Sequence, residues 1–570
     1  MSEVDQITVE VIGNNLLAIA EEMGTTLVRT SYSTNIKERR DCSAALLGPD
    51  GVTVAQAEHI PMHLGSMLGL VAEILKRYPA SEIRPGDVFI ANDPYSGGGT
   101  HLPDITVAAP FFCEGKLILF ASDISHHSDV GGSGKLPRDI YAEGLRLSPI
   151  KIFEEGRLRE DLFELILLNC RLRNERAGDL RAQFAALQTG LSRLEALGAR
   201  YGAEMLSSAI ARTLDQSERQ VRAGIRRMPP GRYEFTDYMD DDGVVDERIP
   251  IKVAVIVEGD ELTFDFTGSA PQVKGNINVV PAALAACVYF AVKAVVDPTL
   301  PANGGYYRAL RIVAPEGTIV NCRPPAPVGF RTDTCQRIVD AILGAMAQAV
   351  PDRVPAACHS TIFSVHFNGY DPNTGGYAYP EVVAGGYGGR PTSDGPDAVQ
   401  VHITNTSNLP VEALEPEYPI LVERYELIPN SGGAGQYRGG LAILRQYRLL
   451  GDEASFGSKG DRNKTAPWGL GGGLPGEPGS LKVNPDTPAE VRLWSKTYDY
   501  TLVKGDVLRI CTPGGGGYGD PKQRDRAAVE RDLLEGKITA EEAERVYGVG
   551  ALDPSPFGRG NRPPGLTASY

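Results

Sequence analysis

The spacing of apolar and polar positions divides the chain into regions of different character. Residues 6–29 repeat apolar side chains at the spacing of one helix face: Ile12, Leu16, Ile19, Met23 and Leu27. Asp5, just before this run, is a candidate N-cap. Helical spacing returns at 162–172, 179–199 and 203–228, which predicts a mainly helical block. From residue 231 onward short β-type stretches dominate, interrupted by helical spacing at 281–295 and 335–349.

Two hairpins are predicted before residue 128. In the first, apolar stretches at 43–47 and 52–55 flank the turn sequence GPDG at 48–51. In the second, apolar runs at 105–112 and 116–121 flank a short break at 113–115. If that turn centres on Glu114 and Gly115, antiparallel pairing places residue 104 roughly opposite 125, and 103 opposite 126.

Glycine changes the picture in the last third of the chain. Many of the 65 glycines gather there in the runs AGGYGGRP, NSGGAGQYRGG and GLGGGLPG, between short β-type stretches. Because glycine allows positive φ and close backbone approach, these runs predict tight turns and packed backbone. We therefore predict an α+β chain of five parts: an N-terminal α/β part (1–158), a helical block (159–230), a mixed β/α part (231–410), a glycine-rich β part (411–523), and a C-terminal helix with a loose Pro/Gly-rich tail (524–570).

Bulk composition narrows the range of functions. A length of 570 residues predicts more than one structural unit, and a net charge of −15 argues against nucleic acid or an anionic membrane as a main partner. The N-terminal sequence MSEVDQITVE lacks the apolar core of a signal peptide, and the longest apolar stretch, 279–292, is too short to span a membrane. The 8 cysteines contain no CxxC pair. We expect a cytoplasmic protein with reduced thiols.

The second hairpin carries the most informative side chains of the sequence. His101 and Asp104 precede its first strand, and His126 follows its second strand. These three residues therefore converge at the open end of the hairpin. Imidazole and carboxylate together suit a divalent cation such as zinc or manganese. A single histidine at a strand end is more often a surface residue, but five of the 8 histidines lie before residue 128: His59, His63, His101, His126 and His127.

Two common catalytic motifs are missing from the sequence, and a third occurs only by spelling: 471–476 fits GxGxxG, but no strand precedes it and Pro475 opposes a helix start. No GxxxxGK[ST] loop occurs, and no serine has glycine at both the second position before it and the second after it. His59 and His63 are four residues apart, but Pro61 between them argues against a helical ligand pair. We interpret these two histidines as pocket-lining candidates.

Several long motifs extend over nearly the whole chain. They include RRDCS at 39–43, NDP at 92–94 followed by His101 and Asp104, SHHSDVGG at 125–132, GDLRAQ at 178–183, DFTGS at 265–269, GGAG at 432–435 and PGGGGYGD at 513–520. Together these motifs resemble the hydantoinase B/5-oxoprolinase family. The resemblance implies a subunit that works with a separate ATP-binding subunit of the hydantoinase A type, in an α2β2 heterotetramer that holds Mg-ATP on the partner.

The resemblance also implies a substrate class and a metal. Members hydrolyse cyclic amides (hydantoins, 5-oxoproline or lactams) at the expense of ATP, and a related branch carboxylates small ketones. The implied cofactor is a divalent metal, which the ligand chemistry above suggests is zinc or manganese, with ligands at the positions that match the family motifs: Asp41, His101, Asp104 and His126. Asp41 rests on the resemblance alone, because the hairpin argument does not supply it.

Further histidines and aspartates near the hairpin are candidates for supporting roles. Imidazole titrates near neutral pH, so His59, His63 and His127 are candidates for proton transfer or oxyanion support. Asp123 and Asp129 are candidates for orienting the ligand imidazoles. Three functional classes stay open: an ATP-dependent cyclic amide hydrolase, an ATP-dependent carboxylase of small ketones, and a scaffold whose metal is purely structural.

Overall fold

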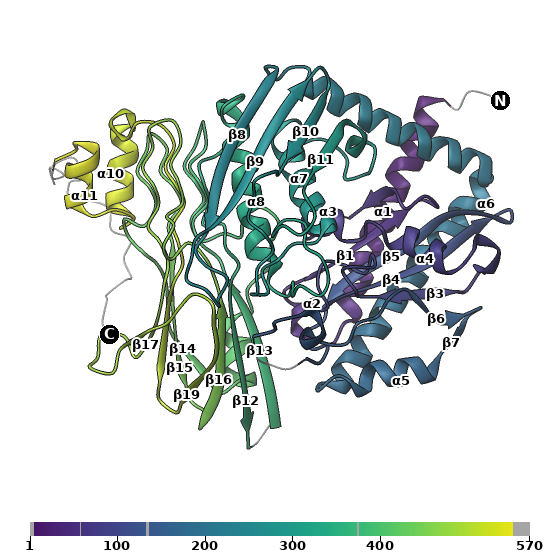
Figure 1. Ribbon diagram of the computed structural model, residues 1–570, viewed down its shortest axis with the longest axis horizontal. Helices are drawn as coiled ribbons and strands as arrows, with labels where there is room; N and C mark the ends of the chain where they lie inside the picture. Colours follow the sequence, from purple (N-terminus) through teal and green to yellow (C-terminus); the bar gives the residue numbers. More distant parts are fainter. Residues whose placement is uncertain (1–4, 58, 133–135, 373–374, 551–570) are drawn as a thin grey trace, which may run out of the picture.

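The N-terminal part is built on one antiparallel sheet. The computed structural model describes residues 5–57, 59–132, 136–372 and 375–550 (Figure 1). Seven strands form this sheet in the order β2-β1-β5-β4-β3-β6-β7. Their bounds are β1 Cys42–Leu47, β2 Thr53–Gln56, β3 Val88–Ala91, β4 Asp104–Cys113, β5 Lys116–His126, β6 Ile150–Glu154 and β7 Arg157–Leu158. Most positions on both faces of the central strands are buried, so the sheet must be covered on both sides.

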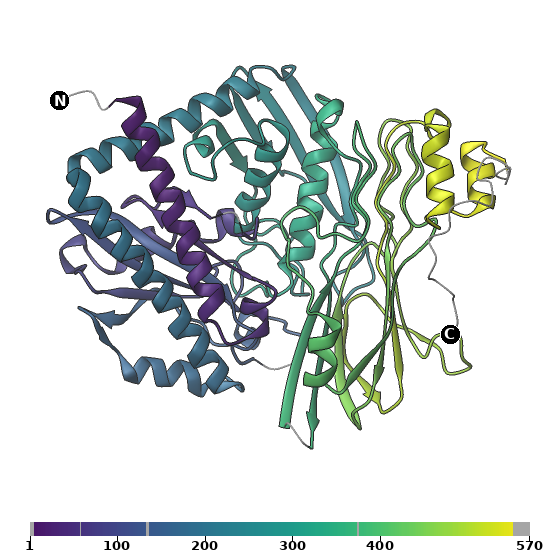
Figure 2. The ribbon, with the colours of Figure 1, turned by 180° about the vertical axis from the view of Figure 1, so that it is seen from behind.

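Helices cover the two faces of this sheet. Helices α1 (Gln6–Thr30) and α6 (Arg173–Ile225) pack together on one face, as Figure 2 shows. The core of the opposite face contains side chains of α4 (Leu70–Arg77). Three shorter helices complete the part: α2 Thr34–Lys37, α3 His63–Ser66 and α5 Glu160–Leu168. The helical block predicted at 159–230 therefore packs on the N-terminal sheet and shares its core.

The helix signals in the sequence have local physical causes. Asp5 caps α1 as predicted, and its carboxylate accepts from the backbone N–H of Thr8 at 3.0 Å. Two of the predicted helices meet inside α6 at Gly202, whose φ of 74° breaks the helical path. The first of these begins at Arg173, six residues before the predicted start at 179.

The register of the β4–β5 hairpin differs by one residue from the prediction. The turn lies at Glu114 and Gly115 as predicted, and both residues have positive φ (51° and 78°). A β-bulge between Phe111 and Phe112 then adds one residue to β5. Asp104 consequently pairs with His126, which brings the two side chains directly opposite each other.

The middle of the chain adds a second sheet and two buried helices. The sheet runs β11-β10-β9-β8, with bounds β8 Gly231–Met239, β9 Ile249–Glu258, β10 Glu261–Asp265 and β11 Leu310–Val313. Helix α8 (Arg331–Met346) packs on β8 and β9, and α7 (Pro281–Val295) packs on α8. Helix α7 coincides with the helical spacing predicted at 281–295 and contains most of the longest apolar stretch of the sequence. Its side chains share one core with the N-terminal part.

Two further sheets share one hydrophobic core and form a sandwich. One has the order β13-β12-β16-β19, and the other has the order β14-β15-β20-β17-β18. The bounds are β12 Phe363–Asp371, β13 Gly375–Val383, β14 Ile420–Leu427, β15 Ile443–Leu449, β16 Glu453–Lys459, β17 Ser480–Val483, β18 Val491–Arg492, β19 Thr497–Val503 and β20 Val507–Cys511, with α9 at Val411–Glu417. The sandwich begins near residue 363, whereas the sequence placed a boundary at 410. Strand pairing between β12 and β16 joins segments about ninety residues apart, and such pairing leaves no local signal.

The glycine runs stack backbone against backbone, as predicted. A Cβ atom at Gly386 would lie 2.0 Å from the carbonyl oxygen of Gly440, and one at Gly515 would lie 2.0 Å from that of Tyr387. Helices α10 (Arg526–Leu534) and α11 (Ala540–Tyr547) lie in the predicted C-terminal part, and the loose tail predicted at the end of that part lies outside the described residues. All eight cysteines are free thiols, and no helix among the described residues is long and apolar enough to cross a bilayer. The architecture confirms the α+β class.

Candidate functional site

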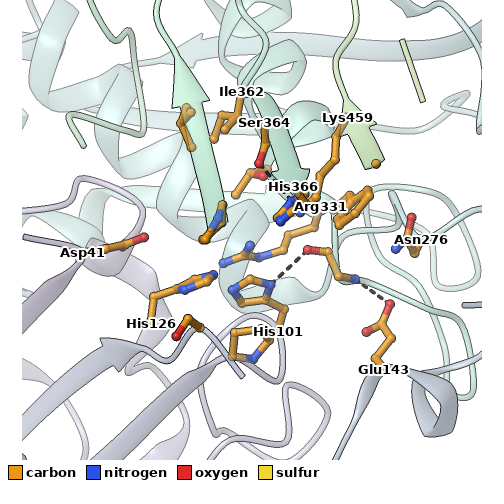
Figure 3. Close-up of a pocket in the computed structure, with 18 of the residues that line it drawn as sticks. Asp41, His101, His126, Glu143, Asn276, Arg331, Ile362, Ser364, His366 and Lys459 are labelled. Carbon is orange, nitrogen blue, oxygen red and sulfur yellow. Dashed lines mark hydrogen bonds between the residues drawn. The ribbon is translucent and has the colours of Figure 1, made fainter. Parts of the chain in front are cut away.

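A cavity of about 360 Å³ lies where the N-terminal sheet, the start of α8 and the β-sandwich meet (Figure 3). One wall comes from the open end of the β4–β5 hairpin and carries His101, Asp104 and His126. The other wall comes from β12, β16 and β19 and carries His366 and Lys459. The volume is within the usual range for a small-molecule site.

The hairpin brings three metal-ligand side chains together. Asp104 is the first residue of β4, His126 is the last of β5, and His101 lies in the turn before them. One ligand atom from each residue lies within 4.8 Å of the others, and the two imidazole centroids are 4.9 Å apart. The sequence predicted this convergence, and the bulge supplies the register that completes it.

The hydrogen bonds of His101 leave two lone pairs facing each other. Its Nδ1 lies 3.0 Å from the carbonyl oxygen of Gly329, and because that oxygen can only accept, Nδ1 is the protonated nitrogen. In the neutral ring Nε2 therefore carries a lone pair, and this atom lies 3.1 Å from Asp104 Oδ1. The other carboxylate oxygen, Oδ2, accepts from Arg331 at 2.8 Å and from Thr100 at 3.1 Å. A cation between Nε2 and Oδ1 satisfies both lone pairs.

The electrostatics keep these groups in the protonation states that metal ligands need. Burial, followed by the charge of Arg331, lowers the pKa of His101 to about 4. Burial and then His101 hold the pKa of His126 well below its ordinary value. Burial alone raises the pKa of Asp104, but His101 and Arg331 outweigh it and hold that pKa well below the ordinary value. Two neutral imidazoles and one carboxylate are the result.

Asp41 lines the same cavity at the end of the loop before β1. Its backbone carbonyl accepts from the N–H of His126 at 3.0 Å, and Figure 3 shows the two side chains next to each other. Its carboxylate stands outside the group of three whose ligand atoms lie within 4.8 Å. Burial and then the charge of Asp104 raise the pKa of Asp41 to about 6.

Comparisons with known proteins identify the family of this chain. The model of the hydantoinase B/oxoprolinase family matches residues 5–521. The chain belongs to this family. It is 42% identical to an uncharacterised protein of Methanocaldococcus jannaschii, over 96% of each chain. It is 34% identical to the B component of a putative D-/L-hydantoinase of a Pseudomonas species, over 97% of this chain and 96% of the other.

Solved structures give the same result for the fold. The ATP-dependent caprolactamase from Pseudomonas jessenii superposes with a TM-score of 0.90 at 31% identity, over 97% of each chain. An acetone carboxylase superposes with a TM-score of 0.87 over 97% of this chain and 81% of the other, at 18% identity. At that identity the second likeness concerns the fold alone.

The remaining histidine candidates of this hydantoinase B/oxoprolinase chain lie in different surroundings. His63 begins α3 and lines the cavity, with Nδ1 2.8 Å from Ser43 Oγ, and burial lowers its pKa to about 4. His127 also borders the cavity, but its Nε2–H donates to Gln183 of α6 at 3.0 Å, so the ring faces the helix. His59 is not among the residues that line the cavity, and its ring packs against Gly24 of α1.

The two aspartates predicted to orient the imidazoles have other partners. Asp123 accepts from Gln183 Nε2 at 2.8 Å, and Asp129 accepts from the backbone N–H groups of Gly131 and Leu172. Among the described residues, neither hydrogen-bonds to His101 or His126. The prediction for this pair is therefore wrong: Asp123 points from β5 toward α6, and Asp129 holds the loop before α6.

Four residues of the site were missed by sequence reasoning. Arg331, Glu143, His366 and Lys459 all line the cavity. Glu143 accepts from the N–H of Gly329 at 2.7 Å and so holds the loop whose carbonyl orients His101, and burial raises its pKa to about 8. These side chains come from segments distant from the hairpin, and no local pattern marks them.

Proposed function

We propose that this chain is the metal-binding subunit of an ATP-dependent hydrolase that opens cyclic amides. The observation that carries the proposal is that His101 Nε2 lies 3.1 Å from Asp104 Oδ1, while Nδ1 of the same ring lies 3.0 Å from the Gly329 carbonyl oxygen, in a cavity of small-molecule size. The relatives named as a hydantoinase component and as an ATP-dependent caprolactamase support the substrate class, which covers hydantoin, 5-oxoproline and lactams.

The donor set of this chain fits zinc or manganese. His101, Asp104 and His126 would hold the ion, with Asp41 as a fourth ligand from the adjacent wall. When bound, such an ion polarises a carbonyl or lowers the pKa of a water molecule. Arg331 fixes one oxygen of Asp104, and the Gly329 carbonyl fixes the tautomer of His101, so that both ligand atoms point to one place.

The chain's own polar groups define the rest of the chemistry. His63 is neutral at pH 7 and lines the cavity, where its imidazole can exchange a proton with a ring nitrogen or a water molecule. Glu143 Oε1 accepts from two backbone N–H groups, and burial keeps its carboxyl protonated near neutral pH. We assign the proton transfer to His63 before His127, because the ring of His127 is hydrogen-bonded to Gln183.

ATP hydrolysis requires a partner in this proposal. An unstrained cyclic amide resists attack by water, and the sequence contains no phosphate-binding loop. We assign Mg-ATP to a separate hydantoinase A-type subunit, in an α2β2 complex, and the substrate-binding metal site to this chain. Relatives that are named as one component of a hydantoinase or of a caprolactamase support a multi-subunit enzyme.

The test is reconstitution with the ATP-binding partner. The purified complex is assayed for ADP release and ring opening with hydantoin, 5-oxoproline, caprolactam and 2-pyrrolidinone, and its metal content is measured by plasma mass spectrometry. Asp104→Asn should lose metal and turnover together, whereas Asp452→Asn, at a side chain 85% exposed, should lose neither. The proposal would be refuted by an Asp104→Asn complex that lacks metal yet opens the ring at the full rate.

The small-ketone carboxylase is the alternative reaction. The shared fold with an acetone carboxylase is compatible with both reactions and favours neither. Including acetone with bicarbonate in the same assay separates them. ADP release that depends on acetone, with no ring opening of any amide, would replace the hydrolase by the carboxylase.

A further inference from the structure

Two cations that line the cavity form no close ion pair with a carboxylate of the described residues. Among the described residues, neither Arg39 nor Lys459 forms an ion pair, although both line the cavity. The third cation there, Arg331, is paired with Asp104 at 2.8 Å. The Lys459 ammonium lies 3.1 Å from the centre of the Phe330 ring, and an Arg39 N–H donates to the backbone carbonyl of Pro380 at 2.9 Å.

Buried cations elsewhere in the molecule, in contrast, are neutralised by carboxylates. They form close ion pairs with buried carboxylates: Arg337 with Asp461 at 3.0 Å, Arg445 with Glu381 at 3.0 Å, Arg462 with Asp237 at 2.8 Å and Lys496 with Asp461 at 2.7 Å. An unpaired charge away from bulk water is costly unless a ligand compensates it. The two cations of the cavity are therefore candidates for contact with an anionic ligand.

The pKa of His366 responds to the charges of both cations, so Lys459 and Arg39 lie near the same side chain. Burial is the main reason why its pKa lies well below the ordinary value, and the charges of Lys459 and Arg39 lower it further. The neutral ring carries one N–H donor, and its Nε2 lies 3.1 Å from Ser364 Oγ. Figure 3 shows Lys459 and His366 on the sandwich side of the cavity, facing the wall that carries His101 and His126.

We propose that Arg39, His366 and Lys459 form a subsite that binds a carboxylate carried on the ring of the cyclic amide. The assignment rests on the proposed function and narrows its substrate class: anionic rings are preferred over neutral lactams. The ring amide then faces the hairpin wall while its carboxylate faces the sandwich wall. Lys459 and Arg39 supply charge-assisted hydrogen bonds, and His366 supplies a neutral N–H.

The burial of Lys459 agrees with this assignment. Burial lowers the pKa of the Lys459 ammonium to about 7, and the more distant carboxylates of Asp333 and Glu143 only partly offset that effect. A bound carboxylate stabilises the protonated ammonium and so raises the pKa that burial lowers. The side chain is also partly exposed, so its ammonium is within reach of a molecule in the cavity.

Direct binding tests the subsite without ATP or partner. The full chain, loaded with zinc, is titrated calorimetrically with 5-oxoproline and with 2-pyrrolidinone, which is the same ring without the carboxylate. We expect 5-oxoproline to bind at least about tenfold more tightly, since a hydrogen bond to a charged group contributes that much. Equal binding of the two rings, or no binding of 5-oxoproline, would overturn the proposal.

Substitutions at Lys459 and Arg39 distinguish the effect of their charges on ligand binding from the effect of their packing. Lys459→Met keeps the stem of the side chain and should weaken 5-oxoproline binding about 10- to 100-fold while leaving 2-pyrrolidinone unchanged. Lys459→Arg should keep most of the preference, and Arg39→Gln should reduce it. Lys504→Met, at a side chain 68% exposed, is the matched control and should behave as wild type. An equal loss for both rings in Lys459→Met would mean that Lys459 only packs the cavity.

Two outcomes distinguish failure of the proposed subsite from failure of the proposed reaction. If the chain prefers 5-oxoproline but its complex opens no cyclic amide, the subsite stands and the proposed reaction is wrong. If the complex opens both rings equally well, and Lys459→Met does too, the reaction stands and the subsite is wrong. Inorganic phosphate is titrated as a further probe: binding of phosphate but not of 5-oxoproline, lost in Lys459→Met, would overturn the carboxylate assignment in favour of a phosphoryl group.

Discussion

Protonation of Asp41 should control how the affinity for the metal depends on pH. Burial and the neighbouring charge of Asp104 raise the pKa of Asp41 to about 6, whereas His101 has a pKa of about 4 and that of His126 lies well below its ordinary value. Between about pH 5 and about pH 7, Asp41 is thus the proposed ligand that changes its protonation state. A metal must displace that proton to bind the carboxylate.

The size of the change in metal affinity follows from the release of one proton by Asp41. For an acid whose pKa is raised to about 6, the metal-free chain holds the proton below that pH, and binding releases it. The affinity should therefore be constant above about pH 7 and fall by about tenfold between about pH 7 and about pH 5. The same shift means that the metal-free chain loses a contribution to stability as the pH rises through about 6 and Asp41 ionises.

Competition for zinc against a fluorescent chelator measures this dependence. The wild-type chain should release about one proton per zinc ion at about pH 5, as buffers of different ionisation enthalpy would show by calorimetry. Asp41→Asn should bind more weakly and with an affinity independent of pH, and Asp452→Asn should follow wild type. Identical pH profiles for wild type and Asp41→Asn would refute the reasoning, as would a two-proton dependence, which would mean that the histidines titrate in this range.

Three further outcomes test the structure. Arg337→Met leaves the buried carboxylate of Asp461 without this 3.0 Å partner and should destabilise the chain by about 3–5 kcal/mol, seen as a lower melting temperature in calorimetry; an unchanged melting temperature would contradict the ion-pair assignment. Gly386→Ala places a Cβ atom 2.0 Å from a backbone carbonyl oxygen and should reduce folded yield, whereas Gly376→Ala, whose nearest atom is 4.0 Å away, should not; equal yields would count against the stacked backbones. Glu143→Gln keeps an acceptor for two backbone N–H groups and should bind zinc nearly as wild type, whereas Glu143→Ala should lose about 10- to 100-fold in affinity; equal affinities would remove the positioning role of Glu143.

Patterns within short segments were reliable in this chain. The spacing of apolar residues predicted α1, and Asp5 caps it as expected. The turn residues Glu114 and Gly115 predicted the hairpin that brings His101, Asp104 and His126 together. These features depend on free energies that act within a turn of helix or a single hairpin, such as capping, positive φ and the burial of one face.

Longer-range features depended on packing between distant segments. The bulge at Phe111, which places Asp104 opposite His126, has no marker in the local sequence. Arg331 and Lys459 reach the cavity from segments more than two hundred residues beyond the hairpin, and their roles follow from which carboxylates they meet or fail to meet.

The sequence by itself thus determined the family, the local elements and three of the candidate metal ligands. Only the tertiary structure decided that His59 packs against Gly24 while His63 lines the cavity, and that Lys459, on the wall facing the candidate ligands, forms no ion pair with any described residue. The physical reason is that periodicity and turn chemistry are properties of neighbouring residues. Charge pairing and cavity lining, in contrast, exist only after strands such as β12 and β16 have been brought together from distant parts of the chain.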